Sequence, residues 1–252
     1  GTPARAPART SSPARAHGAG LPAAIRAVCR HIRAHSGALH VASRRKVLRI
    51  LATGDSMIYP IDQELAIERP AGMRVVRERH DGSGLTTAMI DWARLSVRQA
   101  ARVRPDVTVI SLGGRDAGIP LRDARHRLVA CCAAAWLGLY AGLVRPLVSA
   151  YLRGGRARVY WLLLPAPREA LRAPLFEAVN DAVRLLAPQF GTALRLIATD
   201  AAISPGGYQQ VVTYDGLKIR PRAPDGIHLN HEGACVERGL VTEALRADGL
   251  LH

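Results

Sequence analysis

Lysine, aromatic residues and acidic residues near the N-terminus are scarce in this sequence, and their scarcity narrows the possible functions. Lys46 and Lys218 are the only lysines, so the net charge of +15 is almost all arginine. Nine positive charges lie in the first 46 residues, where there is no Asp or Glu, and the rest of the chain carries +6 (15 − 9). Aromatic residues make up 4%, too few for a base-stacking surface. Together these features argue against nucleic-acid binding.

Cysteine is also sparse, with four in 252 residues: Cys29, Cys131, Cys132 and Cys235. No CxxC pair and no zinc-like spacing occurs, so no metal site is expected from them. Cys131 and Cys132 lie in an apolar run and are interpreted as small buried hydrophobic residues. On this interpretation the cysteines do not identify a redox compartment.

The N-terminal 45 residues are predicted to lie outside the folded domain. Residues 1–20 are rich in Ala, Pro, Arg, Ser and Gly, a composition typical of a disordered tether. Residues 21–36 have helical apolar spacing with a basic face, which suits either a helix packed on the domain edge or one lying on an anionic membrane surface. Because the chain starts at Gly1 and not Met, an upstream segment is expected to have been removed. The folded domain is predicted over residues 46–252.

From Lys46 onward, short β-rich runs alternate with helical stretches. This pattern is typical of an α/β fold with a five-stranded parallel sheet between two helical layers. The predicted strands are 47–53, 73–78, 107–112, 159–164 and 194–199, and the predicted helices are 60–69, 90–103, 121–152, 169–186 and 232–247.

Leu128–Val144 is a run of 17 uncharged residues that has to be weighed as a membrane span. It is shorter than the roughly 20 residues that a bilayer core requires. It also lies where a crossover helix between the third and fourth strands must run. A crossover helix is therefore favoured.

Three polar residues are predicted to meet at one edge of the sheet. Ser56 follows the first strand directly, and ligands of open α/β sheets bind at the carboxyl ends of the strands. Asp225 and His228 follow the fifth strand and are three residues apart, so one turn of chain can place the carboxylate under the imidazole. A serine, a histidine and an orienting carboxylate are the groups that nucleophilic acyl transfer requires.

Other motifs fit less well. The GGRDAG segment has Arg115 where a dinucleotide-binding GxGxxG needs its second glycine. A GxSxG elbow is absent, which excludes the usual α/β-hydrolase arrangement. His228, His231 and Glu232 match neither HExxH nor HxxEH, so no metal and no cofactor are expected.

The segments ATGDSM, DGSGLTT followed by IDW, LGGRDAG and DGIHLN resemble, in that order, the four conserved blocks of the SGNH (GDSL) hydrolase superfamily. The resemblance covers Leu48 to the C-terminus, and WLLLPAPR and DGIHL are similar to its bacterial envelope branch. It implies a flavodoxin-like α/β/α sandwich, with Ser56 as nucleophile and Asp225 and His228 as its partners. It also implies oxyanion donors in the backbone N–H groups of Ser56 and Gly84.

One position departs from this pattern. Arg115 stands where the family has an asparagine that donates a third hydrogen bond to the oxyanion. Arginine also donates, but its side chain is longer, forked and always charged. Either activity is reduced, or the guanidinium serves the oxyanion or an anionic substrate, or catalysis has been lost.

The sequence therefore predicts a serine esterase acting on small acyl groups, chiefly acetyl, on a carbohydrate or envelope glycan. An O-acyltransferase with the same triad and a non-catalytic glycan- or partner-binding domain remain alternatives. The predicted location is extracytoplasmic, near a membrane or cell wall. Asp55, Tyr208, Tyr214 and Arg222 are candidate substrate contacts, the last three because they lie on the long loop before Asp225.

Overall fold

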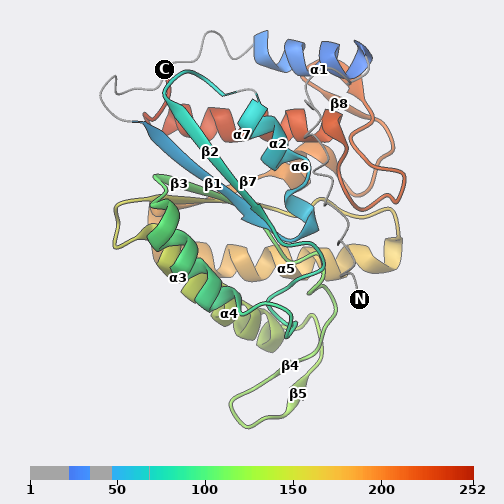
Figure 1. The fold of residues 1–252 in the computed structure, drawn as a ribbon. Helices are drawn as coiled ribbons and strands as arrows, with labels where there is room; N and C mark the ends of the chain where they lie inside the picture. Colours follow the sequence, from blue (N-terminus) through green and yellow to red (C-terminus); the bar gives the residue numbers. More distant parts are fainter. Residues whose placement is uncertain (1–22, 35–46, 68) are drawn as a thin grey trace, which may run out of the picture.

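A computed structural model describes residues 23–34, 47–67 and 69–252. Its centre is a parallel five-stranded sheet in the order β2-β1-β3-β6-β7 (Figure 1). The strands are β1 (Leu48–Gly54), β2 (Met73–Arg79), β3 (Val107–Ser111), β6 (Arg158–Leu162) and β7 (Leu194–Ile197). The predicted five-stranded parallel sheet is confirmed.

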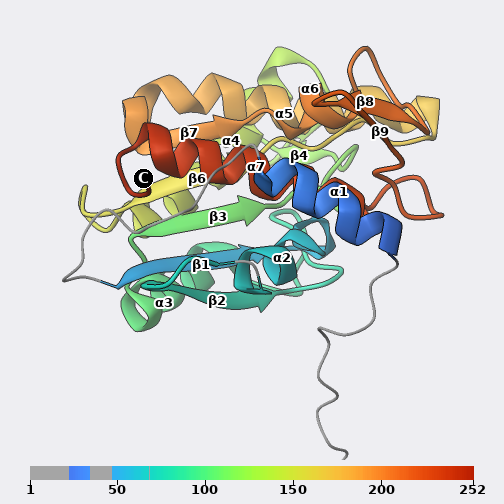
Figure 2. The same cartoon turned by 90° about the horizontal axis from the view of Figure 1, so that it is seen from above.

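Helices cover both faces of this sheet (Figure 1). On one face lie α3 (Trp92–Val103), α4 (Ala134–Leu152) and α5 (Ala173–Leu186). On the other lie α2 (Ile61–Ile67) and α7 (His231–Ala247), with α1 (Ala23–Ala34) packed beside α7 (Figure 2). The arrangement is the predicted three-layer sandwich.

Each face has its own apolar core because side chains alternate along a strand. In β1, Leu51 packs with the α3–α4–α5 layer, whereas Ile50 and Ala52 pack with α2 and α7. The central strand β3 is buried along its whole length. Parallel strands covered on both faces are apolar throughout, which is why these runs were recognisable in the sequence.

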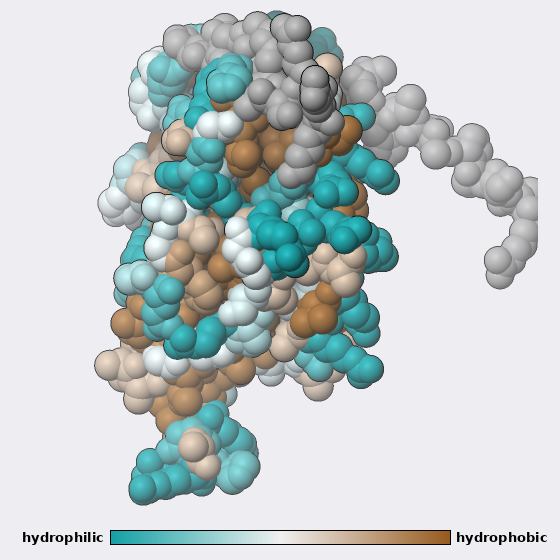
Figure 3. Space-filling view, turned by 90° about the vertical axis from the view of Figure 1, so that its left-hand side faces the viewer, coloured by the Kyte–Doolittle hydropathy of each residue, from teal (hydrophilic) through white to brown (hydrophobic). Residues whose placement is uncertain are grey.

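The predicted helix 121–152 is wrong before residue 134, where α4 begins. Residues 121–129 instead form a hairpin of β4 (Leu121–Arg122) and β5 (Leu128–Val129). Asp123 stabilises the turn, because its side chain accepts hydrogen bonds from the backbone N–H groups of Arg125 and Arg127. His126 adopts a positive φ of 59° there. The hairpin projects from the body and ends in a hydrophilic tip at the bottom of Figure 3.

Within the described residues, α4 is the one helix long and apolar enough to cross a membrane by length and composition. Its aromatic residues Trp136, Tyr140 and Tyr151 are nevertheless fully buried against the sheet and α3 and α5. A core helix of an α/β sandwich has the same composition, so α4 is accounted for as the crossover between β3 and β6.

The described cysteines are disulfide-bonded, so Cys131 and Cys132 are not the simple buried hydrophobic residues that the sequence suggested. Cys29 of α1 is disulfide-bonded to Cys235 of α7, and the half-buried Cys131 and Cys132 are bonded to each other. The apolar side of α1, with Ile25, Val28 and Ile32, packs on the domain. Residues 23–34 thus form a helix that packs on the domain, and the predicted tether of residues 1–20 lies outside the described residues.

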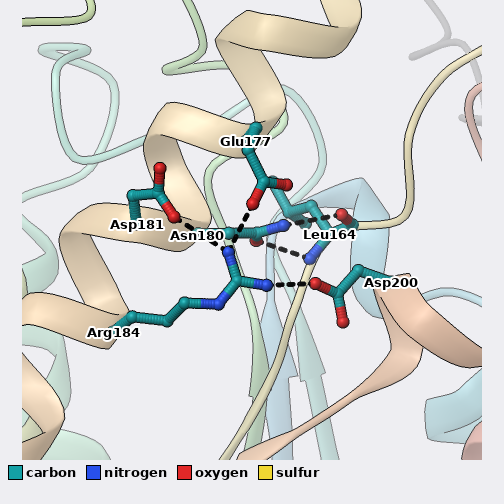
Figure 4. A network of polar contacts seen from close by, with 6 residues as sticks. All are labelled: Leu164, Glu177, Asn180, Asp181, Arg184 and Asp200. Carbon is teal, nitrogen blue, oxygen red and sulfur yellow. Dashed lines mark hydrogen bonds and ion pairs between the residues drawn. The ribbon is translucent and has the colours of Figure 1, made fainter. Parts of the chain in front are cut away.

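Side chains of α5 bind two segments that follow strands of the sheet, one after β6 and one after β7 (Figure 4). Asn180 accepts a hydrogen bond from the N–H of Leu164 at 2.8 Å and donates to its carbonyl at 2.9 Å, which anchors the chain leaving β6. Arg184 pairs with Asp200 of α6 (Thr199–Ile203), besides Glu177 and Asp181 of its own helix. The long loop that includes β8 (Val212–Tyr214) and β9 (Leu217–Ile219) starts from α6.

Candidate active site

Ser56, His228 and Asp225 form a continuous chain of hydrogen bonds at the carboxyl edge of the sheet. Ser56 opens a short 3₁₀ turn, Ser56–Ile58, directly after β1. Its Oγ lies 2.8 Å from Nε2 of His228, and Nδ1 of His228 lies 2.6 Å from Oδ2 of Asp225. With the Nδ1 proton directed at the carboxylate, Nε2 is free to accept the serine proton.

A tight turn places the carboxylate under the imidazole. Asp225 Oδ1 accepts hydrogen bonds from the backbone N–H groups of Ile227 and His228 at 2.8 and 3.0 Å. Gly226 has a φ of 73°, and a Cβ there would come within 2.6 Å of the Arg168 side chain. Glycine is therefore required for this turn to fit against the β6 loop, whose Arg168 N–H donates to the Gly226 carbonyl.

Asp225 is favoured in its ionised form, and its side chain is 47% exposed. Partial burial acts to raise its pKa, but the hydrogen bonds from the His228 ring and from the two backbone N–H groups outweigh it and lower the pKa. An ionised Asp225 keeps the proton of the imidazole on Nδ1, as general-base catalysis at Nε2 requires.

Asp55, a predicted substrate contact, points into the protein and is 1% exposed. Its Oδ1 accepts the Met57 N–H at 2.8 Å, and its Oδ2 accepts the N–H groups of Gly113 and Gly114 at 3.0 and 3.1 Å. Burial raises its pKa to about 6, and these hydrogen bonds oppose the rise. Asp55 instead ties the turn of Ser56 to the loop after β3.

The predicted oxyanion donors are not all directed at the serine. The N–H of Gly84 donates to the Thr87 hydroxyl at 3.1 Å. Arg115 is exposed at the surface of the β3 loop. Ser56 is the first residue of its turn, where backbone N–H groups have no partner within the turn.

Asp116, which the sequence interpretation passed over, holds the two glycine loops together. Its buried carboxylate accepts the N–H groups of Leu85 and Thr86 at 2.9 Å each, the Thr86 hydroxyl at 2.7 Å and the Tyr140 hydroxyl at 2.9 Å. A Cβ on Gly84 would lie 2.3 Å from Asp116 Oδ1, so this contact requires glycine. Its position directly after Arg115 in the third resemblance block was the signal available in the sequence.

A pocket of about 540 Å³ is lined by direct sequence neighbours of the triad, Pro224 and Leu229 among them, and by two of the predicted substrate contacts, Tyr208 and Arg222. Arg222 is nearly buried, and it donates to the carbonyls of Ile227 and Ala166 and to the Ser204 hydroxyl. Burial lowers its pKa to about 10, so its guanidinium remains charged at neutral pH.

Tyr214, the third residue predicted on this loop, is not among the residues that line this pocket. It lies in β8 and packs with Cys29 and Ile32 of α1 in a separate apolar cluster. The loop before Asp225 folds back on itself here as the β8–β9 hairpin.

Residues 49–242 match the model of a family described as protein of unknown function (DUF459). No curated protein matches the chain. Among solved structures, it is similar to a carbohydrate esterase family 3 protein from Talaromyces cellulolyticus, with a TM-score of 0.55, 18% identity and coverage of 80% of this chain and 98% of that one.

Two further structures are similar. A GDSL-like lipase from Bacteroides thetaiotaomicron has a TM-score of 0.50 at 13% identity, over 88% of this chain and 98% of that one. An acetyl xylan esterase from Geobacillus stearothermophilus has a TM-score of 0.51 at 16% identity, over 79% of this chain and 95% of that one. At sequence identities this low, the similarity establishes the fold and not the activity. The chain belongs to the DUF459 family, and its fold is that of the SGNH (GDSL) hydrolases.

Proposed function

We propose that this protein is a serine esterase that hydrolyses small acyl esters through Ser56, His228 and Asp225. His228 Nε2 takes the proton of Ser56 as Oγ attacks the ester carbonyl, and the tetrahedral intermediate then expels the alcohol, which receives that proton. Water, deprotonated by the same imidazole, then attacks the acyl-enzyme, and the serine recovers its proton. The single observation that carries the proposal is the 2.8 Å contact between Ser56 Oγ and His228 Nε2, with the 2.6 Å contact behind it.

The negative charge that develops on the carbonyl oxygen needs donors. The Ser56 N–H supplies one at the start of its turn, and rotation of the Thr87 hydroxyl away from Gly84 would release a second. The Arg115 guanidinium reaches the oxyanion only if the β3 loop adjusts, since it is exposed in this form. Loss of one such donor typically costs on the order of 10²–10³ in rate.

The substrate class proposed is an acetyl or other small O-acyl ester on a carbohydrate of the cell envelope. Two of the structural neighbours are named as carbohydrate or acetyl xylan esterases. The disulfides Cys29–Cys235 and Cys131–Cys132 favour an oxidising compartment and therefore an extracytoplasmic location.

Hydrolysis of p-nitrophenyl acetate and labelling by a fluorophosphonate test the proposal. The protein should turn over the ester and be labelled at Ser56, and Ser56→Ala should lose both, with kcat falling by at least roughly 10³-fold. The melting temperature should stay within about 2 °C, because only a hydroxyl on a half-buried turn is removed.

A rival function is a non-catalytic binding domain with the same fold, which the engaged Gly84 N–H and the substitution of asparagine by Arg115 favour. Neither turnover nor labelling of the unmutated protein would support that rival. Labelling of Ser56→Ala at the rate of the unmutated protein would show that another residue is the nucleophile.

A further inference from the structure

The pocket beside the triad is built from the residues that flank each catalytic side chain. Tyr59 follows the turn of Ser56, Pro224 precedes Asp225, and Leu229 and Asn230 follow His228. Arg168, which packs against the Gly226 turn, closes another side. His228 has to protonate the departing alcohol, so the alcohol part of the ester must lie next to its imidazole. The pocket lined by the neighbours of His228 is the space on that side.

Three guanidinium groups line the pocket, from Arg168, Arg220 and Arg222. Among the residues that the structure describes, neither Arg168 nor Arg220 has a carboxylate within ion-pair distance, and both side chains are exposed. Arg222 donates its hydrogen bonds to two carbonyls and a hydroxyl, all of them uncharged. Its guanidinium therefore keeps its positive charge without a carboxylate in direct contact.

Acidic groups near the pocket do not balance these charges. Glu232 lines it, and its Oε2 accepts the backbone N–H of Arg220 at 2.7 Å. Asp225 follows the lining residue Pro224 and is engaged by His228. Glu237 attracts Arg222, but burial raises the pKa of Glu237 and so favours its neutral form. Arginine presents a planar fork of donors that matches carboxylate and phosphate groups. The pocket is therefore suited to a negatively charged group.

We infer that this pocket binds the alcohol part of the ester as a sugar carrying an anionic group, a carboxylate or a phosphate. The inference rests on the proposed esterase function, whose substrate class it narrows. Arg220 and Arg168 contact the anionic group from the solvent side. Arg222 contributes its charge from beneath, where it also stacks over the Tyr208 ring at 5.7 Å. Tyr59 and Tyr208 offer ring surface to the sugar.

Binding can be measured without turnover by titrating Ser56→Ala protein with glucuronic acid, glucose 6-phosphate and glucose in a calorimeter. The two anionic sugars should bind at least roughly tenfold more tightly than glucose. Whichever of them binds more tightly distinguishes a carboxylate from a phosphate preference.

Arg220→Ala in the same background should weaken binding of the anionic sugars by roughly five- to tenfold and leave glucose binding unchanged. Arg98→Ala, which removes an exposed arginine from α3 on the opposite face of the sheet, is the matched control and should change neither. Arg168→Ala provides a second pocket variant if Arg220→Ala unfolds, as judged by circular dichroism.

Equal affinity for the three sugars, or equal effects of Arg220→Ala and Arg98→Ala, would overturn the inference. If the unmutated protein hydrolyses p-nitrophenyl acetate in that case, the proposed esterase function survives. Tight binding of anionic sugars by a protein with no esterase activity would overturn the esterase function and leave the pocket as an anionic-sugar site.

Discussion

Adjacent residues at the end of β1 differ in what their side chains contact. Asp55 faces inward and binds three backbone N–H groups, whereas Ser56 faces His228. The inward carboxylate holds the β3 loop, which also carries Arg115 and Asp116, against the serine turn. Arg115 is therefore positioned by a rigid loop base even though its own head is exposed.

Replacing Arg115 by asparagine tests what the long side chain does. If arginine is an imperfect oxyanion donor, Arg115→Asn should keep or raise kcat for p-nitrophenyl acetate, by up to roughly 10²-fold, because a short amide fits the donor position better. Arg115→Ala, which provides no donor, is the control and should not raise kcat. A large loss in Arg115→Asn would instead assign the guanidinium its own role.

At the scale of elements, α1 is joined to α7 both by packing and by a covalent bond. Ile25, Val28 and Ile32 pack on the cluster that includes Cys235, and Cys29 bonds to Cys235 across a separation of 206 residues. The apolar side of α1 is thus occupied by the protein, which leaves its basic side, with Arg26 and Arg30, toward solvent. Contact of α1 with a membrane would therefore have to be electrostatic, through its basic side, because its apolar side is packed on the domain.

Removing the Cys29–Cys235 bond should destabilise the protein. Cross-links that close long loops restrict the unfolded chain most, so the double variant Cys29→Ser, Cys235→Ser should lose about 2–5 kcal/mol of unfolding free energy in denaturant titration. The pair Cys131→Ser, Cys132→Ser is the comparison, because neighbouring residues close almost no loop. Equal losses in the two double variants would show that loop closure is not the cause.

At the scale of the whole molecule, Glu237 of α7 is a buried acidic group that interacts with Arg222 of the loop before Asp225. Glu237 is 2% exposed, and burial raises its pKa to about 8, against the attraction of Arg222. Arg222 lines the pocket, so α7, the pocket wall and the sheet edge share one electrostatic network.

Stability should consequently depend on pH. Because the pKa of Glu237 is raised above its usual 4.5, the folded state retains the proton more strongly than the unfolded chain. The unfolding free energy should therefore fall as pH rises from about 4.5 to about 8, and Glu237→Gln should remove that component. Denaturant titrations of both proteins between pH 5 and pH 9 measure it. Parallel pH profiles would contradict a buried, protonated Glu237.

Part of the fold followed from local pattern, because strands buried on both faces are continuous apolar runs and glycine and proline separate them from helices. The hairpin at 121–129 was not predicted because its strands are only two residues long each, and only the turn at Asp123 and His126 distinguishes it. The Cys29–Cys235 disulfide was equally hidden, since its pairing depends on the distance between residues far apart in the chain.

What the sequence by itself determined is the set of five parallel strands, their order along the chain, and the three polar residues placed by that order at one sheet edge. Tertiary structure alone decided which side chains face each other there: Asp55 turned inward, Tyr214 packed on α1, and Arg168 and Arg220 met Arg222 around a pocket. The physical reason is that strand periodicity is local, whereas the direction of a loop side chain is set by packing and hydrogen bonds with distant segments.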